Sequence, residues 1–210
     1  MIRARLNAFQ FLTVAILSLL LGCCHGSISA ETEVTADGSL SSSSVPYLLH
    51  KPQSQKIIYG TAWKKGTTAK LVYDAIQAGF RRIDTACQPK HYNEPGVGAG
   101  WTAAARDLGL TRNDFWLQTK YTSLNGQDVN SIPYDKNAPL DERVRQSLNE
   151  SFKNLQTDYI DSIVMHGPED SWEKNLIVWR EFEKFVEKGM VGKIGISKLP
   201  EWKYPLLIFF

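Results

Sequence analysis

Short apolar runs alternate with segments of helical periodicity from about Lys56 onward, and this alternation limits the possible folds more than any other feature of the chain. The run Ile57 to Tyr59 predicts a strand. The apolar positions after it recur with the helical period until Gly79, which predicts the end of a helix. Because strands joined through helices must run parallel, the sequence predicts an α/β fold with a parallel sheet.

The same β/α unit recurs about five times along the chain. Further strands are predicted at Phe80 to Ile83, Phe115 to Thr119 and Tyr159 to Met165, with another starting at Lys193. Further helices are predicted at Trp101 to Leu108, Asp141 to Leu155 and Leu176 to Glu187. Such units suit a doubly wound sheet or a (β/α)8 barrel. The junction at residues 59–66 reads YGTAWKKG and lacks the G-x-G-x-x-G fingerprint of dinucleotide-binding doubly wound folds, which favours the TIM-type barrel.

The first 30 residues have the order of a secretory signal peptide. Arg3 and Arg5 precede an apolar stretch at residues 11–21, which is followed by small residues. The stretch is shorter than the roughly 20 residues that span a bilayer, so we expect cleavage, no stable membrane insertion, and a secretory or extracellular location. Two alternatives are an uncleaved leader that anchors the chain, and a lipidated Cys23, because Leu20 to Cys23 resembles a bacterial lipoprotein cleavage box.

Residues 31–55 contain few large apolar side chains and include a run of four serines, which predicts a flexible linker. The folded domain is therefore expected at residues 56–210. The 210-residue chain has a formal net charge of +2, with acidic and basic residues interspersed. This charge pattern contains no basic patch that would bind nucleic acid or a membrane surface, so it favours a small-molecule partner. We expect no metal site.

Polar residues end three successive predicted strands. Asp84 closes the second strand, Lys120 the third and His166 the fourth, while Tyr92 lies in the loop after Asp84. In a barrel the carboxyl ends of the strands meet on one face, so these side chains should lie together. A lysine charge beside a phenol favours phenolate and lowers its pKa, and a carboxylate keeps that lysine charged. An imidazole N–H can orient a carbonyl oxygen. The set predicts hydride addition to a carbonyl.

Motifs in this order resemble the aldo/keto reductase family. The matching segments are residues 79–86 (GFRRIDTA), 91–98 (HYNEPGVG), 115–120 (FWLQTK), 155–166 (LQTDYIDSIVMH) and 192–197 (GKIGIS). The resemblance covers about residues 56–197. It implies a (β/α)8 barrel, reduction of an aldehyde or ketone to an alcohol, and a nicotinamide cofactor, usually NADP.

The resemblance also implies roles for individual residues. Tyr92 is the expected proton donor, Lys120 and Asp84 its tuning pair, and His166 the group that orients substrate. Asp84 and Ser197 are expected to contact the cofactor. Trp63 is expected either to line the substrate pocket, as the matching aromatic residue does in the family, or to pack in the core.

Two features depart from the family pattern. Residues 88–90 look inserted between Asp84 and Tyr92, which a loop tolerates at small entropic cost. After Ser197 the family continues with further strands that hold most of the cofactor, whereas the sequence continues for 13 residues with an apolar ending. We therefore expect an incomplete barrel with an open sheet, and carbonyl reduction that is weak or absent in this chain. The alternatives are a non-catalytic binding or regulatory subunit with the same fold, and an incomplete gene model.

Overall fold

A computed structural model describes residues 56–198 of the chain. The predicted signal peptide (residues 1–30), the predicted linker (residues 31–55) and the apolar ending that begins at Trp202 lie outside the described residues. In residues 56–198, no helix is both long and apolar enough to cross a membrane.

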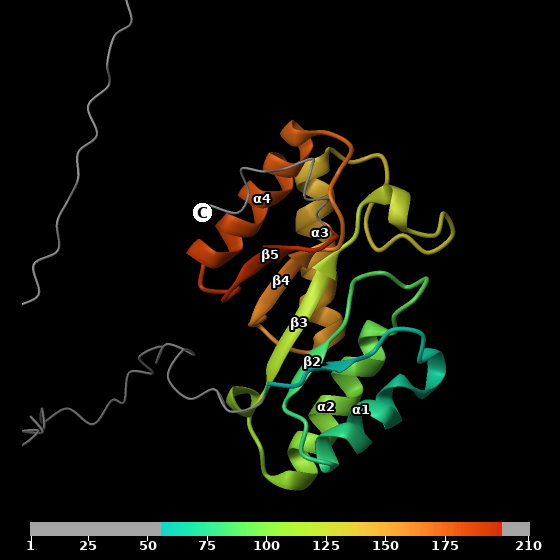
Figure 1. The fold of residues 1–210 in the computed structure, drawn as a ribbon, viewed down its shortest axis with the longest axis vertical. Helices are drawn as coiled ribbons and strands as arrows, with labels where there is room; N and C mark the ends of the chain where they lie inside the picture. Colours follow the sequence, from blue (N-terminus) through green and yellow to red (C-terminus); the bar gives the residue numbers. More distant parts are fainter. Residues whose placement is uncertain (1–55, 199–210) are drawn as a thin grey trace, which may run out of the picture. The chain divides into compact units, whose positions relative to one another are not determined.

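The described residues contain a parallel sheet whose strand order is the order of the chain (Figure 1). Its strands are β1 (Tyr59–Gly60), β2 (Arg82–Asp84), β3 (Trp116–Tyr121), β4 (Ser162–Met165) and β5 (Ile194–Ile196). Each strand pairs only with its neighbours in sequence, and β1 does not pair with β5. The predicted parallel α/β fold is therefore confirmed, and the sheet is open rather than closed into a barrel.

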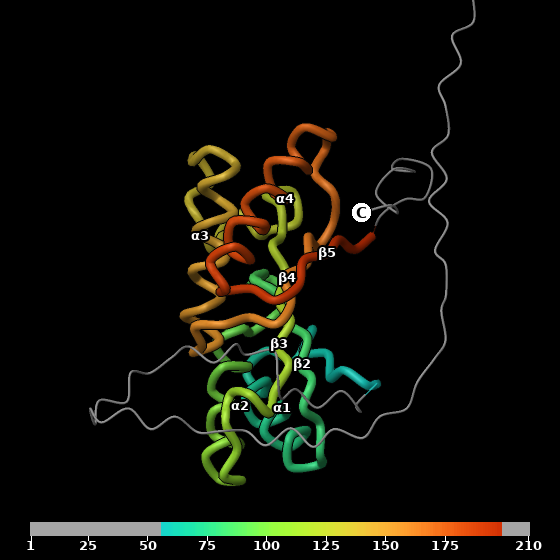
Figure 2. The backbone as a smooth tube through the Cα atoms, turned by 90° about the vertical axis from the view of Figure 1, so that its left-hand side faces the viewer, coloured from blue at the N-terminus to red at the C-terminus, as the bar shows by residue number. Residues whose placement is uncertain are grey.

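Helices connect the successive strands and lie along one face of the sheet (Figure 2). They are α1 (Thr68–Gln77), α2 (Glu94–Leu108), α3 (Leu140–Leu155) and α4 (Trp172–Glu187). Consecutive helices contact one another, α1 with α2, α2 with α3, and α3 with α4. This is the arrangement that right-handed crossovers give when each strand is added beside the preceding one.

The helices begin and end where local chemistry allows. The Asn93 side chain accepts a hydrogen bond from the Gly96 backbone N–H at 3.0 Å and caps the start of α2. Gly109, with a φ of 65°, ends the same helix. The Ser171 hydroxyl accepts from the Lys174 N–H at 3.3 Å, so α4 begins at Trp172, four residues before the predicted start at Leu176.

Two glycines within α2 allow close packing against the neighbouring helices. A Cβ at Gly98 would lie 2.1 Å from the Asn154 backbone oxygen on α3, and one at Gly100 would lie 2.5 Å from the Ala69 backbone oxygen on α1. No side chain fits at such distances. These glycines therefore bring the backbone of α2 close to both neighbouring helices.

The core fills the space between the sheet and its helices. Inward side chains of the strands, such as Ile83, Leu117 and Ile163, are buried against helix residues such as Val72 and Leu148. By contrast Ile57 is 68% exposed, and β1 begins at Tyr59 rather than at the predicted Ile57. The core fixes one face of the sheet and leaves the carboxyl ends of the strands to carry polar groups.

Candidate active site

The carboxyl ends of three neighbouring strands bring the predicted polar residues together. Asp84 is the last residue of β2, Lys120 is next to last in β3, and His166 follows β4 directly. Tyr92 lies in the loop between β2 and α2, two residues before that helix begins. The structure therefore contains the cluster of polar residues that the sequence predicted at the strand ends.

A partly buried ion pair forms the base of the site. The Lys120 ammonium group lies 2.6 Å from Asp84 Oδ2 and 2.7 Å from Asp84 Oδ1, and it also donates to the Thr85 carbonyl oxygen at 2.7 Å. The two side chains are 11% and 22% exposed, respectively. An ammonium group carries three protons, so these acceptors can use all of its hydrogen bonds.

The contact between Lys120 and Tyr92 is made through the aromatic ring. The Lys120 Nζ lies 5.2 Å from the centroid of the Tyr92 ring, which is a cation–π distance. Burial, and secondly the negative charge of Asp84, raise the pKa of Tyr92 above its ordinary value. The expectation that Lys120 lowers the pKa of Tyr92 is wrong for this structure, because the lysine directs its hydrogen bonds to Asp84 and Thr85 instead of to the phenol.

His166 lies across the site from Tyr92. The two ring centroids are 6.0 Å apart with an interplanar angle of 72°. The Thr122 hydroxyl lies 2.9 Å from His166 Nδ1 and forms a hydrogen bond with it. Burial, followed by the positive charge of Lys120, lowers the pKa of His166 to about 4. The imidazole is therefore neutral at physiological pH.

Two residues that the sequence analysis missed support this cluster. Gln118 donates from Nε2 to Asp84 Oδ1 at 2.6 Å and accepts from the Ser162 hydroxyl at 3.0 Å. Gln118 and Lys120 are two positions apart on β3, so they point to the same face of the sheet. A period-two reading of that strand would have found Gln118, whereas nothing local in the sequence identifies Thr122 as the partner of His166.

A cavity of about 580 Å³ opens beside Tyr92 and His166. Its lining residues come from the loops after β1, β2, β3, β4 and β5: Trp63, Gln88, Lys90, His91, Tyr92, Thr122, Ser123, Asn125, Gly126, His166, Gly167 and Lys198. Trp63 is 65% exposed, and its ring centroid lies 3.8 Å from that of His91. Of the two expected locations, Trp63 therefore lies on the wall of the pocket and not in the core.

The inserted residues hold the loop that carries Tyr92. Gln88 is buried, and its Nε2 donates to the Gly126 carbonyl oxygen at 2.6 Å. The Gln88 carbonyl in turn accepts from the backbone N–H groups of His91 and Tyr92, each at 3.0 Å. The insertion therefore forms a hydrogen-bonded turn, and Tyr92 stays on the face that carries Lys120 and His166.

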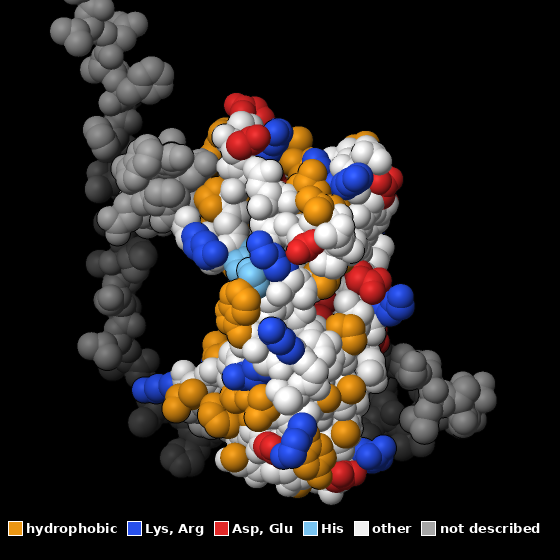
Figure 3. Space-filling view, turned by 90° about the vertical axis from the view of Figure 1, so that its right-hand side faces the viewer, with side chains coloured by type: hydrophobic (Ala, Val, Ile, Leu, Met, Phe, Trp, Pro, Cys, Tyr) orange, Lys and Arg blue, Asp and Glu red, His pale blue; other side chains and the backbone are white. Residues whose placement is uncertain are grey.

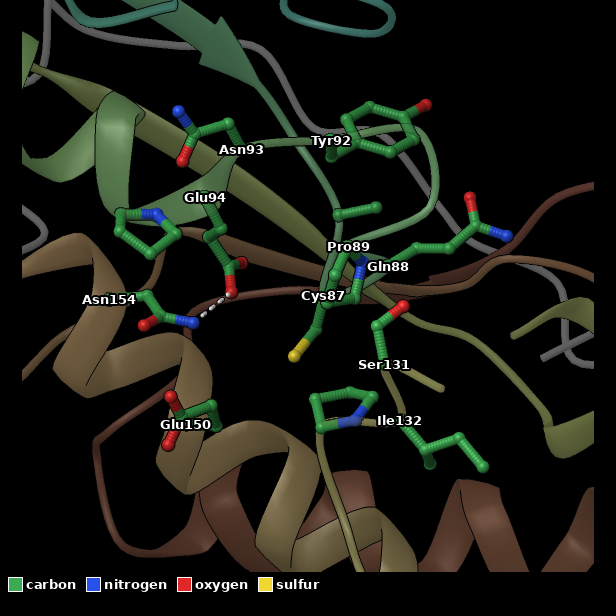
Figure 4. Close-up of a pocket in the computed structure, with 13 residues that line it drawn as sticks. Cys87, Gln88, Pro89, Tyr92, Asn93, Glu94, Ser131, Ile132, Glu150 and Asn154 are labelled. Carbon is green, nitrogen blue, oxygen red and sulfur yellow. Dashed lines mark hydrogen bonds between the residues drawn. The ribbon is translucent and has the colours of Figure 1, made fainter. Parts of the chain in front are cut away.

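A second cavity of about 440 Å³, drawn in Figure 4, shares Gln88 and Tyr92 with the first in its lining. The buried Cys87 and Glu94 lie on its wall, and Asn154 Nδ2 donates to Glu94 Oε2 at 3.2 Å. Glu94 also accepts from the hydroxyls of Thr119 and Ser151. Burial raises the pKa values of both Cys87 and Glu94. These bonds tie the start of α2 to β3 and α3, which suits a structural role.

Two described residues offer hydrogen-bond acceptors of the kind that suit the nicotinamide end of a dinucleotide. Asp84 is still 22% exposed despite its partners, so its carboxylate keeps room to accept from a ribose hydroxyl. Ser197 donates its hydroxyl proton to the His166 carbonyl oxygen at 2.7 Å, which leaves its own oxygen free to accept from a carboxamide N–H. Among residues 56–198, no group of three or more His, Cys, Asp and Glu side chains could hold a metal ion.

Comparison with known proteins places this chain in a family. The model described as "Aldo/keto reductase family" matches residues 56–205. Methylglyoxal reductase DkgA of Yersinia pestis is 31% identical over 129 residues, which are 61% of this chain and 39% of that protein. The crystal structure of an aldo/keto reductase from Brucella melitensis superposes with a TM-score of 0.56 at 31% identity, over 72% of this chain and 51% of the other.

A further structural neighbour was solved with the cofactor. The crystal structure of Bombyx mori aldo-keto reductase in complex with NADP superposes with a TM-score of 0.56 at 25% identity, over 72% of this chain and 49% of the other. The matched part of the chain thus spans about half the length, or less, of the relatives named here.

Proposed function

The chain belongs to the aldo/keto reductase family, and from that membership we propose that it serves NAD(P)H-dependent reduction of an aldehyde or ketone to an alcohol. The observation that carries this proposal is that Tyr92 and His166 line the same cavity, next to the Asp84–Lys120 ion pair. The whole reaction is a proposal because the chain spans only part of its relatives.

Tyr92 is the proton donor in this proposal. Its raised pKa keeps the phenol protonated at neutral pH, so the site holds a proton ready for transfer. When bound, a reduced nicotinamide supplies the hydride that adds to the carbonyl carbon. Tyr92 then delivers its proton to the oxygen of the same carbonyl, and the product is an alcohol.

His166 orients the carbonyl in this proposal. It is neutral, because its pKa is about 4. When the Thr122 hydroxyl donates to Nδ1, the remaining proton of the imidazole resides on Nε2. That N–H can donate to the carbonyl oxygen and stabilise the negative charge that develops on it.

The Asp84–Lys120 pair positions Tyr92 and shapes the electrostatics beneath it. Lys120 faces the ring of Tyr92, and Asp84 offsets most of the lysine charge. The ammonium group contacts the Tyr92 ring at a cation–π distance and is itself held by Asp84 and Thr85. We therefore assign the pair to holding the Tyr92 ring in place beside His166.

NADP is the cofactor we propose, with Asp84 and Ser197 as the described residues that contact its nicotinamide end. Two observations support it: the acceptor capacity of these side chains, and the NADP in the Bombyx mori relative. We also propose that Trp63 lines the substrate pocket, since it lies on the cavity wall.

The test is to titrate the full chain with NADPH, following the quenching of tryptophan fluorescence, and then to measure NADPH oxidation with an aromatic aldehyde. We expect saturable binding and turnover. Absence of both, together with a partner protein that co-purifies in stoichiometric amount, would contradict the reductase proposal. That result would favour a non-catalytic subunit of the same fold.

We also propose that residues 1–30 direct the chain to the secretory pathway. The basic and apolar order of the segment supports this proposal. Expression in a secreting host, followed by N-terminal sequencing of the protein from the medium, tests it. Retention inside the cell with an intact N-terminus would contradict it.

A further inference from the structure

The wall of the 580 Å³ cavity carries positive charge that the proposed reaction does not use. Lys90 and Lys198 line it together with His91, and its lining residues include no aspartate or glutamate. Figure 3 shows histidine side chains on this face of the molecule with lysine or arginine side chains next to them. Neither lysine forms a salt bridge with any residue of the described part of the chain.

The positive groups come from two separate parts of the chain. Lys90 and His91 belong to the inserted loop between β2 and α2, and Lys198 follows β5. The loop is held in place, because the His91 backbone accepts from the Trp63 N–H at 2.7 Å and its N–H donates to the Gln88 carbonyl oxygen. The backbone of the loop that carries Lys90 is therefore held by hydrogen bonds, and both lysines line the cavity.

The charge of this wall reaches the reaction centre. After burial and the charge of Lys120, the positive charges of Lys198 and His91 also lower the pKa of His166. Because Lys90 and Lys198 line the cavity and no acidic side chain does, the cavity wall attracts an anion.

We propose that the substrate carries an anionic group, a carboxylate or a phosphate, in addition to its carbonyl, and that Lys90 and Lys198 bind this group at the cavity wall. This inference rests on the proposed function. The anion site is separate from Tyr92 and His166, which bind the carbonyl oxygen. The ammonium groups select among carbonyl compounds by charge, because an uncharged substrate gains nothing from them.

The experiment compares matched aldehydes. Dissociation constants of 4-formylbenzoate, 4-formylphenyl phosphate and benzaldehyde are measured with the NADPH-loaded full chain by quenching of tryptophan fluorescence, since Trp63 lies on the cavity wall. We expect at least one anionic aldehyde to bind about tenfold more tightly than benzaldehyde at low salt. The preference should shrink as ionic strength rises. Whichever of the two anionic aldehydes binds more tightly shows whether the site prefers a carboxylate or a phosphate.

Charge variants test the assignment to the two lysines. In the double variant Lys90→Gln, Lys198→Gln, we expect the ratio of benzaldehyde to anionic dissociation constants to fall to about one. The charge-conserving variant Lys90→Arg, Lys198→Arg should keep the preference. Lys153→Gln, an exposed lysine on α3 away from the cavity, should leave the ratio unchanged.

The outcomes separate this inference from the proposed function. Equal affinity for charged and uncharged aldehydes, with NADPH oxidation intact, overturns the anion site alone. A preference that survives the double glutamine variant overturns it as well. If no aldehyde binds and none is reduced, both the inference and the proposed function fail.

Discussion

The carboxylate of Asp84 lies with both oxygens within 2.7 Å of the Lys120 ammonium group, although the two residues are 36 positions apart in the chain. The register of the sheet accounts for this. Asp84 pairs with Gln118 across β2 and β3, so Lys120 lies two residues further along the same face. The ion pair therefore reports directly on the correct pairing of these two strands.

Replacing Asp84 with asparagine should destabilise the domain. The variant leaves the Lys120 charge, on a side chain only 11% exposed, without its counter-ion. We expect a loss of about 1–3 kcal/mol, between the values for exposed and fully buried pairs. Urea unfolding of the full chain, followed by circular dichroism, measures it.

Asp74→Asn is the matched control for that experiment. Asp74 pairs with Lys70 on the surface of α1, where the two side chains are 47% and 77% exposed. An exposed pair contributes little, so this variant should lower the unfolding free energy by well under about 1 kcal/mol. An equal loss of unfolding free energy in the two variants would show that the Asp84–Lys120 pair stabilises the domain no more than an exposed pair does.

Removal of the Tyr92 hydroxyl should abolish most of the proposed reductase activity. Tyr92→Phe keeps the ring beside Lys120 and His166 but deletes the proton donor. We expect kcat to fall about 10²- to 10⁴-fold with little change in stability. NADPH oxidation measures the activity. Tyr73→Phe, which removes a hydroxyl bonded to Asp107 at the surface, is the control and should keep it. Unchanged turnover in Tyr92→Phe would exclude the phenol as the acid.

The His166 imidazole should titrate near pH 4. Burial and neighbouring positive charges lower its pKa to about 4 from an ordinary value of 6.5. Proton NMR of the histidine ring signals against pH checks this value. The signal that is lost in His166→Gln identifies the residue. A midpoint near 6.5 for that signal would contradict the buried position described for His166.

The same shift makes stability depend on pH. Between pH 4 and 6.5 the unfolded chain binds more protons at His166 than the folded chain does, so stability rises with pH in this window. The contribution is complete above 6.5 and is lost as the pH falls toward 4. After allowance for partial exposure it should be on the order of 1–2 kcal/mol. Urea unfolding of wild type and His166→Gln across this range should give stability curves that run parallel above pH 6.5 and differ in slope below it.

A methyl group at Gly98 should disrupt the contact between α2 and α3. The added Cβ of Gly98→Ala would lie 2.1 Å from the Asn154 backbone oxygen, which neither helix can avoid without moving. We expect a loss of about 2 kcal/mol or more in the free energy of unfolding. Gly66→Ala, where nothing lies within 4 Å of the added Cβ, should be close to neutral in the same thermal or urea unfolding measurement. A neutral Gly98→Ala would mean that the helices lie further apart than described.

The sequence predicted the order and type of the elements better than their ends. Apolar periodicity located each strand and helix, because the faces they bury against one another impose that period. It misplaced the start of α2, since Gly96, Gly98 and Gly100 are poor helix formers that are tolerated for close packing. It also extended the first strand to Ile57, which is apolar but exposed and contacts no partner strand.

The sequence predicted four residues of the site but not their supporting partners Gln118 and Thr122, nor the direction of the Tyr92 pKa shift. Strand ends on one face made the proximity of Asp84, Lys120 and His166 a consequence of topology. The direction of the Tyr92 pKa shift could not be predicted from the sequence. It depends on how deeply the phenol is buried and on which acceptors the Lys120 ammonium group donates to. Burial and hydrogen-bond geometry are properties of the folded chain that a residue pattern does not contain.

The strand order of the sheet, which repeats the order of the chain, bears on how the protein is made. Each strand after β1 docks against one that left the ribosome earlier, so none of β2 to β5 has to wait for a later strand before it can pair. The described domain can therefore assemble vectorially during translation, beginning with the β1–β2 pair and extending one β/α unit at a time.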